Sequence, residues 1–562
     1  MASRSSSSRN TTSLSLPAAE LTAIKPIVDM SPEYRSEFQI IDLRFHVPLN
    51  YSKMRSDSNS IEISLKLMCG YKHSLAAPAT AVPTTGRLLE SPDVDTDEVE
   101  LTPSNIHAIL SKRSLVVYLS GGPGDRNPPV RMSELNQFFL QKGYWVLYPE
   151  YRGTGDSSAI EYPAVSDQTL EHFRKLRHYR QTAIARDLES VRRRLQPADT
   201  NAGTNSTVKW SLLGQSLGGW VALTYMSFWP AGLREVFLTG GLPPVRRSPR
   251  EVYIKLFHRV IRRNNDYYAK YPDDVRRVRR LVRYLAAQRK GRGIWLPRGG
   301  WLTAQRFLCL GRILGDTEKW TDVHELLKDM ESDVYGPGNT EFGLGQATDR
   351  RDRAAWGETM SHATLWLYET LDSWKLEHRP LYAVLHEAMY CNKEGERSRW
   401  AASEVAARFP QFWWVNCNPE DLSQELEERE EKAGGGSNST NDEEETRLYF
   451  SGEMVYPFFF HTYKELGKFK FAAEWIAQYK WDERLYDVEA LRRNIVPVIA
   501  LSYGARDMYV DSEYSLETWE KIGGPKSTVH QDRDWEHGAI RQNTANVLQS
   551  IWQEKESLDT SE

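Results

Sequence analysis

The stretch GQSLGG at residues 214–219 constrains the fold of this chain more than any other feature. It follows the run VKWSLL, which predicts a buried strand, and it precedes WVALTYMSF, which predicts a buried helix. A GxSxG turn between a strand and a helix lifts its serine above the sheet edge, with glycines where a Cβ would clash. We therefore predict that Ser216 is a nucleophile.

Short apolar runs that end at turn residues lie on both sides of this motif. LVVYL at 115–119 leads into GGPG, YWVLY at 144–148 leads into PEYRGTGDSS, and IVPVIALS begins at 495. Helical patterns separate the first two runs from each other and from the strand before Ser216, which predicts a parallel sheet with right-handed crossovers. Alternating segments at 38–49 and 61–67 predict an antiparallel entry to that sheet.

Changes in composition divide the chain into four parts. Residues 1–37 begin with a Ser-rich stretch and are expected to form a disordered tail, although a targeting role for it stays open. The strand patterns occupy 38–245 and 476–562, which predicts a core made of two chain segments. Residues 246–475 are helix-like and dense in Trp and Tyr, as in an inserted helical cap. Within them, the acidic and Gly/Ser-rich stretch near 419–447 is expected to be a disordered loop.

Composition excludes several classes of protein. The 72 Lys and Arg against 76 Asp and Glu give a formal charge of −4, too near neutral for a nucleic-acid partner bound through phosphates. The apolar runs are much shorter than the ~20 residues that cross a bilayer, so no membrane association is expected. The four cysteines form no CxxC pair, which indicates neither a zinc site nor a disulfide framework. We expect a cytoplasmic protein without metal or cofactor.

A serine nucleophile needs a base to accept its proton and a carboxylate to orient that base, in the chain order Ser, Asp, His. Two of the 13 histidines follow the last apolar strand pattern. His530 ends the apparent strand STVH, whereas His537 precedes the final helix, so we predict that His537 is the base. Asp507 lies in YGARDMYVD, which overlaps the end of the apolar run IVPVIALSYG, and is the predicted acid. Its rival Asp511 is better placed as a helix N-cap.

The oxyanion of an acyl-transfer reaction needs two backbone N–H donors. One is expected from Leu217, which follows the nucleophile, and the other from Gly121 or Gly122 in the glycine loop after an earlier strand. Together with Ser216, these features predict the α/β class, specifically an α/β-hydrolase core with a mostly parallel sheet and an inserted helical cap domain.

The motifs SGGPG, YPEYRGTGDSS, RDLESVRRRL, GQSLGG, FLTGGLPP, LHEAMYC, GEMVYP, RDMYV and EHGAI occur in this order over most of residues 38–552. Together they resemble the proline iminopeptidase (prolyl aminopeptidase) family. The resemblance implies a metal-free serine peptidase that removes an N-terminal proline, or another N-terminal residue, from peptides. Two positions depart from the family pattern: Ser120 replaces the His of HGGPG, and Glu150 and Tyr151 replace the first two residues of DQRG.

An aminopeptidase recognises a free N-terminus, and carboxylates can bind the substrate ammonium. The resemblance assigns this role to Glu387 in LHEAMYC and Glu453 in GEMVYP. The expected partner is therefore a small peptide with a free N-terminus, and the oligomeric state stays open. Two alternatives remain: an esterase or thioesterase with the same triad, and a non-catalytic binding protein of the same fold.

Overall fold

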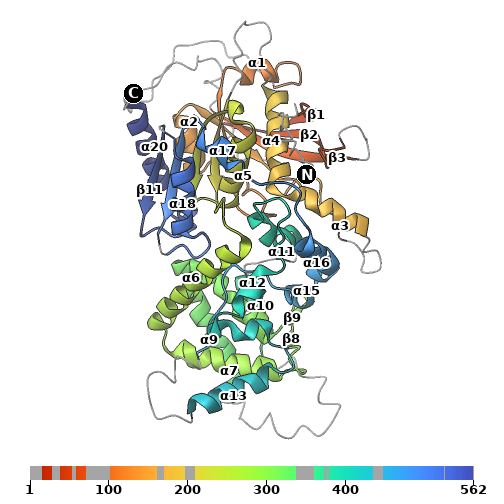
Figure 1. Ribbon diagram of the computed structural model, residues 1–562, viewed down its shortest axis with the longest axis vertical. Helices are drawn as coiled ribbons and strands as arrows, with labels where there is room; N and C mark the ends of the chain where they lie inside the picture. The colour runs from red at the N-terminus through yellow and green to blue at the C-terminus, as the bar shows by residue number, and fades with distance from the viewer. Residues whose placement is uncertain are drawn as a thin grey trace, which may run out of the picture.

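Nine strands of the described chain form one sheet, in the order β1-β2-β3-β5-β4-β6-β7-β10-β11 (Figure 1). The computed structural model describes residues 16–27, 38–53, 59–70, 101–160, 162, 170–196, 209–336, 360–372, 376, 379–434, 447–504, 506–524 and 526–560. The strands of this sheet are β1 Glu20–Pro26, β2 Gln39–Pro48, β3 Ser60–Cys69, β4 Ser114–Leu119, β5 Tyr144–Pro149, β6 Trp210–Gln215, β7 Leu233–Thr239, β10 Val498–Tyr503 and β11 Ser527–Asp532.

Strand direction divides the sheet in two. The strands from β5 through β4, β6, β7 and β10 to β11 pair in parallel. The first three strands pair antiparallel, and β3 joins the parallel part by an antiparallel pairing with β5. The predicted parallel sheet with an antiparallel entry is confirmed.

Helices cover both faces of the parallel strands. Along β4, Leu115, Val117 and Leu119 pack into one apolar cluster, whereas Val116 and Tyr118 pack into the other. Helices α4 Gln181–Leu195 and α5 Leu217–Phe228 belong to the first cluster, and α2 Glu134–Gln141 and α20 Thr544–Thr560 belong to the second. Burial on both faces explains why these strands read as continuous apolar runs. The other core helices are α1 Ile106–Leu110, α3 Leu170–Leu176, α17 Val488–Arg492, α18 Ser512–Ile522 and α19 Ala539–Gln542.

Strand β1 corrects one expectation for the N-terminal part. Residues 1–37 were expected to be disordered, yet Glu20–Pro26 pairs antiparallel with β2. This edge strand buries little of its surface, so its sequence lacks the strong alternation of a half-buried strand. The rest of the predicted tail, 1–15 and 28–37, lies outside the described residues.

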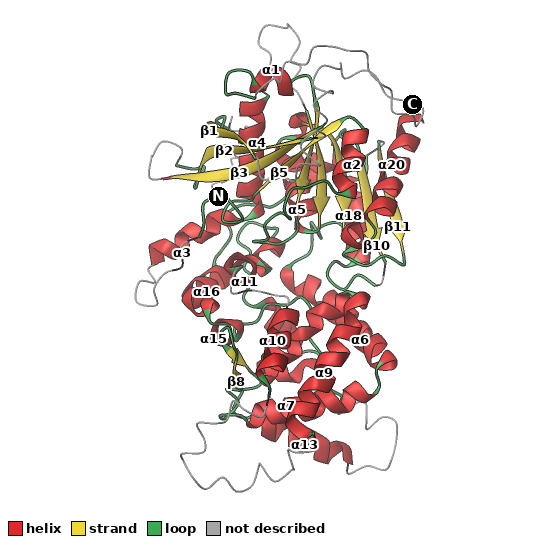
Figure 2. Ribbon diagram, turned by 180° about the vertical axis from the view of Figure 1, so that it is seen from behind, coloured by secondary structure: helices red, strands yellow, loops and turns green. Residues whose placement is uncertain are grey.

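Most of the chain between β7 and β10, residues 249–478, is mainly helical and lies below the sheet in Figures 1 and 2. Its first helix has a capping box, in which Ser248 and Glu251 satisfy each other's backbone N–H groups. A short hairpin, β8 Ile294–Trp295 with β9 Trp301–Leu302, interrupts the helices. The helices are α6 Pro249–Lys270, α7 Asp273–Ala287, α8 Ala304–Leu308, α9 Trp320–Tyr335, α10 His362–Leu371, α11 Pro380–Leu385, α12 Ala401–Ala406, α13 Leu422–Gly434, α15 Phe459–Thr462 and α16 Lys470–Gln478.

Helix α13 corrects a second expectation. The stretch near 419–447 was expected to be a disordered loop, but Leu422–Gly434 forms a helix. Leu422 and Leu426, one turn apart, are buried, and Arg283 forms an ion pair with Glu430. The burial of two leucines is enough to pack a polar helix against the protein while its other face is exposed to solvent. Residues 435–446 lie outside the described chain.

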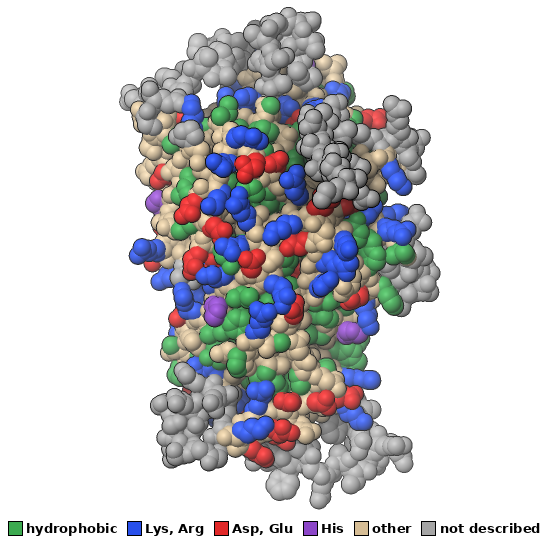
Figure 3. Space-filling view, viewed as in Figure 1, with side chains coloured by type: hydrophobic (Ala, Val, Ile, Leu, Met, Phe, Trp, Pro, Cys, Tyr) green, Lys and Arg blue, Asp and Glu red, His purple; other side chains and the backbone are tan. Residues whose placement is uncertain are grey.

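The molecular surface carries both signs of charge. Figure 3 shows Lys and Arg interspersed with Asp and Glu over one face. None of the helices in the described ranges is both long enough and apolar enough to span a bilayer.

Candidate active site

Ser216 lies at a sharp turn between β6 and α5. Its backbone has φ 54° and ψ −122°, a conformation that non-glycine residues rarely adopt. Its N–H donates to the carbonyl oxygen of Thr239 at 3.0 Å. A Cβ at Gly218 would lie 1.9 Å from the Leu119 carbonyl oxygen, and one at Gly214 would lie 2.7 Å from Gly218. Both glycines are therefore required for the close approach of strand and helix at this turn.

His537 and Asp507 form a hydrogen-bonded pair. His537 Nδ1 lies 2.9 Å from Asp507 Oδ2. The other oxygen, Oδ1, accepts from the N–H groups of Tyr509 at 2.8 Å and Val510 at 3.0 Å. Asp507 is 1% exposed, so these contacts fix the carboxylate where β10 ends.

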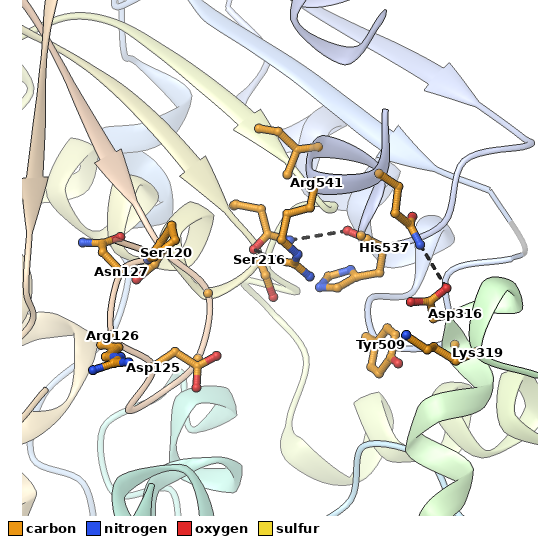
Figure 4. Close-up of a pocket in the computed structure, with 18 of the residues that line it drawn as sticks. Ser120, Asp125, Arg126, Asn127, Ser216, Asp316, Lys319, Tyr509, His537 and Arg541 are labelled. Atoms are coloured by element: carbon orange, nitrogen blue, oxygen red, sulfur yellow. Dashed lines mark hydrogen bonds between the residues drawn. The ribbon is translucent and has the colours of Figure 1, made fainter. Parts of the chain in front are cut away.

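The His537 ring lies beside the Ser216 turn. A Cβ at Gly240 would lie 3.2 Å from both His537 Cε1 and the Ser216 backbone nitrogen, so the ring and the turn flank this glycine closely. Figure 4 shows the two side chains next to each other at the pocket surface. The structure thus brings Ser216, His537 and Asp507 together, as the sequence order predicts.

The rival residues lie in other surroundings. Asp511 caps α18, because its Oδ1 accepts from Tyr514 N–H at 2.9 Å, and its Oδ2 pairs with Arg259 at 2.5 Å. His530 lies 3.4 Å from Glu554 of α20 and is half exposed. Neither takes part in the hydrogen bond between His537 and Asp507.

The glycine loop after β4 packs against the Ser216 turn. A Cβ at Gly121 would lie 3.5 Å from Ser216 Cβ, and both Gly121 and Gly122 line the same pocket as Ser216. Leu217 is the first residue of α5, where N–H groups have no partner within the helix. These residues are neighbours of Ser216, which is compatible with the predicted oxyanion site, and the role of their N–H groups stays a prediction.

Glu150, one of the departures from the family pattern, contacts the continuation of this loop. Glu150 is buried, and its carboxylate accepts from Asn127 N–H at 3.2 Å, while Asn127 Nδ2 donates to Pro149 O at 2.7 Å. Burial raises the pKa of Glu150. Arg152 is buried in an ion pair with Asp187 at 2.5 Å. Glu150 therefore ties the end of β5 to the loop that continues from Gly122.

The pocket above Ser216 has a volume of about 1410 Å³ and lies between the core and the helical region. Core residues Ser216, Gly121 and His537 line one side, and Arg312, Tyr382 and Glu453 come from the helical region. Among the described residues, no group of three or more His, Cys, Asp or Glu is arranged to hold a metal ion.

Glu453 faces this pocket. Tyr382 OH donates a short hydrogen bond to its Oε1, and Arg312 Nε lies 3.9 Å from the same oxygen. Burial raises the pKa of Glu453, while the positive charge of Arg312 lowers it. The carboxylate is thus a partly desolvated acceptor held in a fixed position.

Glu387 is not among the residues that line the pocket, so the structure gives no support to its predicted role in binding the substrate amine. It is 5% exposed, and its two oxygens accept from Ala401 N–H at 3.0 Å and Ala402 N–H at 2.9 Å. Burial raises the pKa of Glu387 to about 7. Its carboxylate caps the first turn of α12, which is a structural role.

Among the pocket residues that sequence reasoning missed are Arg312, Tyr382 and Arg541. Arg312 and Tyr382 lie in segments without a recognisable motif, and only tertiary packing brings them to Glu453. Arg541 could have been found, because it follows the predicted base His537 by only four residues, just before the predicted final helix.

The sheet order and the strand–Ser216–helix turn define an α/β-hydrolase. No protein-family model matches the chain. It is 30% identical to "Proline iminopeptidase" of Aeromonas sobria over 438 residues, 78% of this chain and 86% of that protein. It is also 30% identical to "Proline iminopeptidase aneH" of Aspergillus aculeatus over 473 residues, 82% and 90% of the two chains. The chain belongs to the proline iminopeptidase family and is a hydrolase.

Solved structures give weaker likenesses. The proline iminopeptidase of Mycobacterium smegmatis is 12% identical, with a TM-score of 0.29 over 88% of this chain and 96% of that one. A thermophilic esterase of Thermogutta terrifontis is also 12% identical, with a TM-score of 0.32 over 91% and 98% of the two chains.

Proposed function

We propose that this protein is a serine aminopeptidase that releases N-terminal proline, or another N-terminal residue, from peptides. The observation that carries the proposal is the hydrogen bond of 2.9 Å between His537 and Asp507 beside the Ser216 turn. Ser216 and His537 line one pocket with Glu453. The two relatives named proline iminopeptidase support the choice of substrate.

The chemistry follows from these positions. Ser216 Oγ attacks the carbonyl carbon of the first residue, and His537 accepts the Ser216 proton and then gives it to the leaving amine. Asp507 holds the Nδ1–H of His537, which leaves Nε2 free to act as the base. Backbone N–H groups of Leu217 and of Gly121 or Gly122 bind the oxyanion. Water then attacks the acyl-enzyme and releases the amino acid.

Glu453 is proposed to bind the substrate ammonium. The positive charge of Arg312 favours the ionised form of this carboxylate against the effect of burial, and burial strengthens the attraction of the ionised form to a second cation in the pocket. A substrate blocked at its N-terminus brings no charge to this site, so Glu453 would select a free amine.

Turnover of proline p-nitroanilide tests the proposal. The wild type should release nitroaniline, and Ser216→Ala should not. Glu453→Gln should lower kcat/KM by about 100-fold for proline p-nitroanilide but by less than tenfold for an N-acetylated ester. Equal losses on both substrates would favour the esterase or thioesterase alternative. Failure of a fluorophosphonate to label Ser216 in folded protein would favour a non-catalytic binding protein.

We also infer a cytoplasmic location. Cys69, Cys309, Cys391 and Cys417 are all free thiols, and the first three are buried, which supports a reducing compartment. Fluorescence of a tagged full-length chain would test the compartment.

A further inference from the structure

Arg541 differs from the other arginines near the centre of the pocket. Arg312 and Arg379 pair with carboxylates, at 3.9 Å from Glu453 and 2.8 Å from Asp125. Arg541 has an exposed side chain, and no carboxylate of the described chain lies within 4.0 Å of its guanidinium. Its Nη1 donates to Gln215 Oε1 at 3.3 Å. The pocket therefore holds a cationic group with remaining donors next to Ser216.

The fold places Arg541 on the side of the leaving group. Arg541 follows His537 by four residues, about one helical turn. Gln215 contacts both, since its Nε2 donates to the His537 carbonyl oxygen at 3.4 Å while its Oε1 accepts from Arg541. Figure 4 shows Arg541 extending toward Ser216 beside the His537 ring. Because His537 must reach the leaving nitrogen, the leaving half of a substrate lies near this part of the pocket.

We propose that Arg541 binds the α-carboxylate of the leaving amino acid, so that the enzyme prefers dipeptides to longer or amidated peptides. The inference rests on the proposed aminopeptidase function. In a dipeptide the carboxylate carbon is two bonds from the nitrogen that receives the proton from His537. A guanidinium can bind a carboxylate through two parallel hydrogen bonds, which also fixes the orientation of the leaving residue.

The charges of the pocket agree with this substrate class. Glu453 supplies a negative charge from the helical region, and Arg541 supplies a positive charge from α19 of the core. A dipeptide zwitterion carries an ammonium at its first residue and a carboxylate at its second, which matches these two groups. In a longer peptide a neutral amide replaces that carboxylate, and the Arg541 charge gains no ionic partner at this position.

The experiment compares three substrates: prolyl-alanine, prolyl-alanine amide and proline p-nitroanilide. We expect the wild type to cleave prolyl-alanine with a kcat/KM about tenfold higher than that of its amide. Arg541→Gln should bring this ratio close to one, and Arg541→Lys should retain part of it, because Lys keeps the charge but not the fork of donors. Arg131→Gln is the matched control, since Arg131 also lines the pocket but is not next to His537. It should keep the wild-type ratio.

The outcomes separate the two proposals. A wild-type ratio near one, or a ratio unchanged in Arg541→Gln, overturns the role of Arg541 while the aminopeptidase function stands on turnover of the anilide. Absence of turnover of all three substrates by the folded wild type overturns the aminopeptidase function and the role of Arg541 with it. Equal unfolding temperatures of the variants show that a changed ratio does not come from misfolding.

Discussion

Arg263 of α6 donates a hydrogen bond of 2.7 Å to Glu536, the residue immediately before His537. The pair is buried, with 4% and 10% of the two side chains exposed. Thr317 N–H donates to the other Glu536 oxygen at 2.9 Å, and Arg263 Nε donates to Leu314 O at 3.0 Å. The helical region therefore contacts the loop that carries His537 through a buried ion pair and the hydrogen bonds around it.

Arg259, one turn earlier on α6, makes the matching contact with the other loop. It pairs with Asp511 at 2.5 Å and donates to the carbonyl oxygens of Gly504 at 3.3 Å and Asp507 at 3.2 Å. One helix thus contacts both the loop of Asp507 and the loop of His537. Because the two loops must keep a 2.9 Å hydrogen bond between them, α6 helps to position the pair.

We predict that Arg263→Gln lowers kcat by roughly 100-fold with a smaller change in KM, because displacement of a catalytic group by about 1 Å has this effect. The substitution leaves Glu536 buried without its ionic partner, which shifts the loop of His537. The rate of Ser216 labelling by a fluorophosphonate should fall in parallel, since labelling needs His537 but not the substrate amine.

The neighbouring Arg262→Gln is the control, because Arg262 is exposed on the same helix. The fluorophosphonate should label Ser216 of this variant at the wild-type rate. If Arg263→Gln raises KM while labelling stays at the wild-type rate, Arg263 supports the helical region only and does not position His537.

The turn at Ser216 gives a second prediction. Gly218→Ala should prevent folding or lower the unfolding temperature by more than 10 °C, because its Cβ would overlap the Leu119 carbonyl oxygen of β4. Gly219→Ala is the matched control: its Cβ would lie 3.6 Å from the nearest atom, an ordinary contact, and alanine favours the helix. Thermal unfolding of both variants checks the difference. Similar melting temperatures would contradict the close packing of α5 on β4.

A third prediction separates the two aspartates near the end of β10. Asp507→Asn should lower kcat by roughly 10³–10⁴-fold with little change in stability, because an amide no longer favours the His537 tautomer with its proton on Nδ1. Asp511→Asn should instead lower the unfolding temperature through loss of the Arg259 ion pair, with kcat reduced by less than tenfold. Steady-state kinetics and thermal unfolding of both variants test this, and the reverse ranking would make Asp511 the partner of His537.

The order of the strand and helix patterns along the sequence was sufficient to predict the parallel sheet and the grouping of Ser216, Asp507 and His537. Each of these residues follows a strand at the same edge of the sheet, so strand order and chain order together place them. Strand β1 and helix α13 were missed because each buries a small apolar face, which leaves a weak periodic signal.

Glu387 and Glu453 of the helical region show that a single sequence does not tell which of two similar acids reaches the pocket. Glu387 and Glu453 both occur as single acids in apolar segments, and nothing in those segments distinguishes them. Their surroundings differ. Glu387 accepts hydrogen bonds from N–H groups at the start of α12, 14 and 15 residues away, whereas Glu453 contacts Tyr382 and Arg312 at the pocket. Such partners are set by tertiary packing.

The structural role of Glu387 gives a last prediction, on the pH dependence of stability. Burial raises its pKa from 4.5 to about 7, so between these pH values the unfolded chain releases a proton that the folded chain retains. The contribution of Glu387 to the free energy of unfolding is therefore complete below about pH 4.5 and is lost as the pH rises through 7. Since each unit of pKa shift corresponds to about 1.4 kcal/mol, the free energy of unfolding falls by about 3 kcal/mol over this range.

Glu387→Gln has no proton to release, so its unfolding temperature should fall less than that of the wild type between pH 5 and pH 8. Glu394→Gln, at an exposed position in the same segment, should follow the wild type. Thermal unfolding at several pH values measures the three slopes. A wild-type slope in Glu387→Gln would mean that the Glu387 carboxylate is ionised throughout this range in the folded protein, with the two N–H groups of α12 outweighing the cost of its burial.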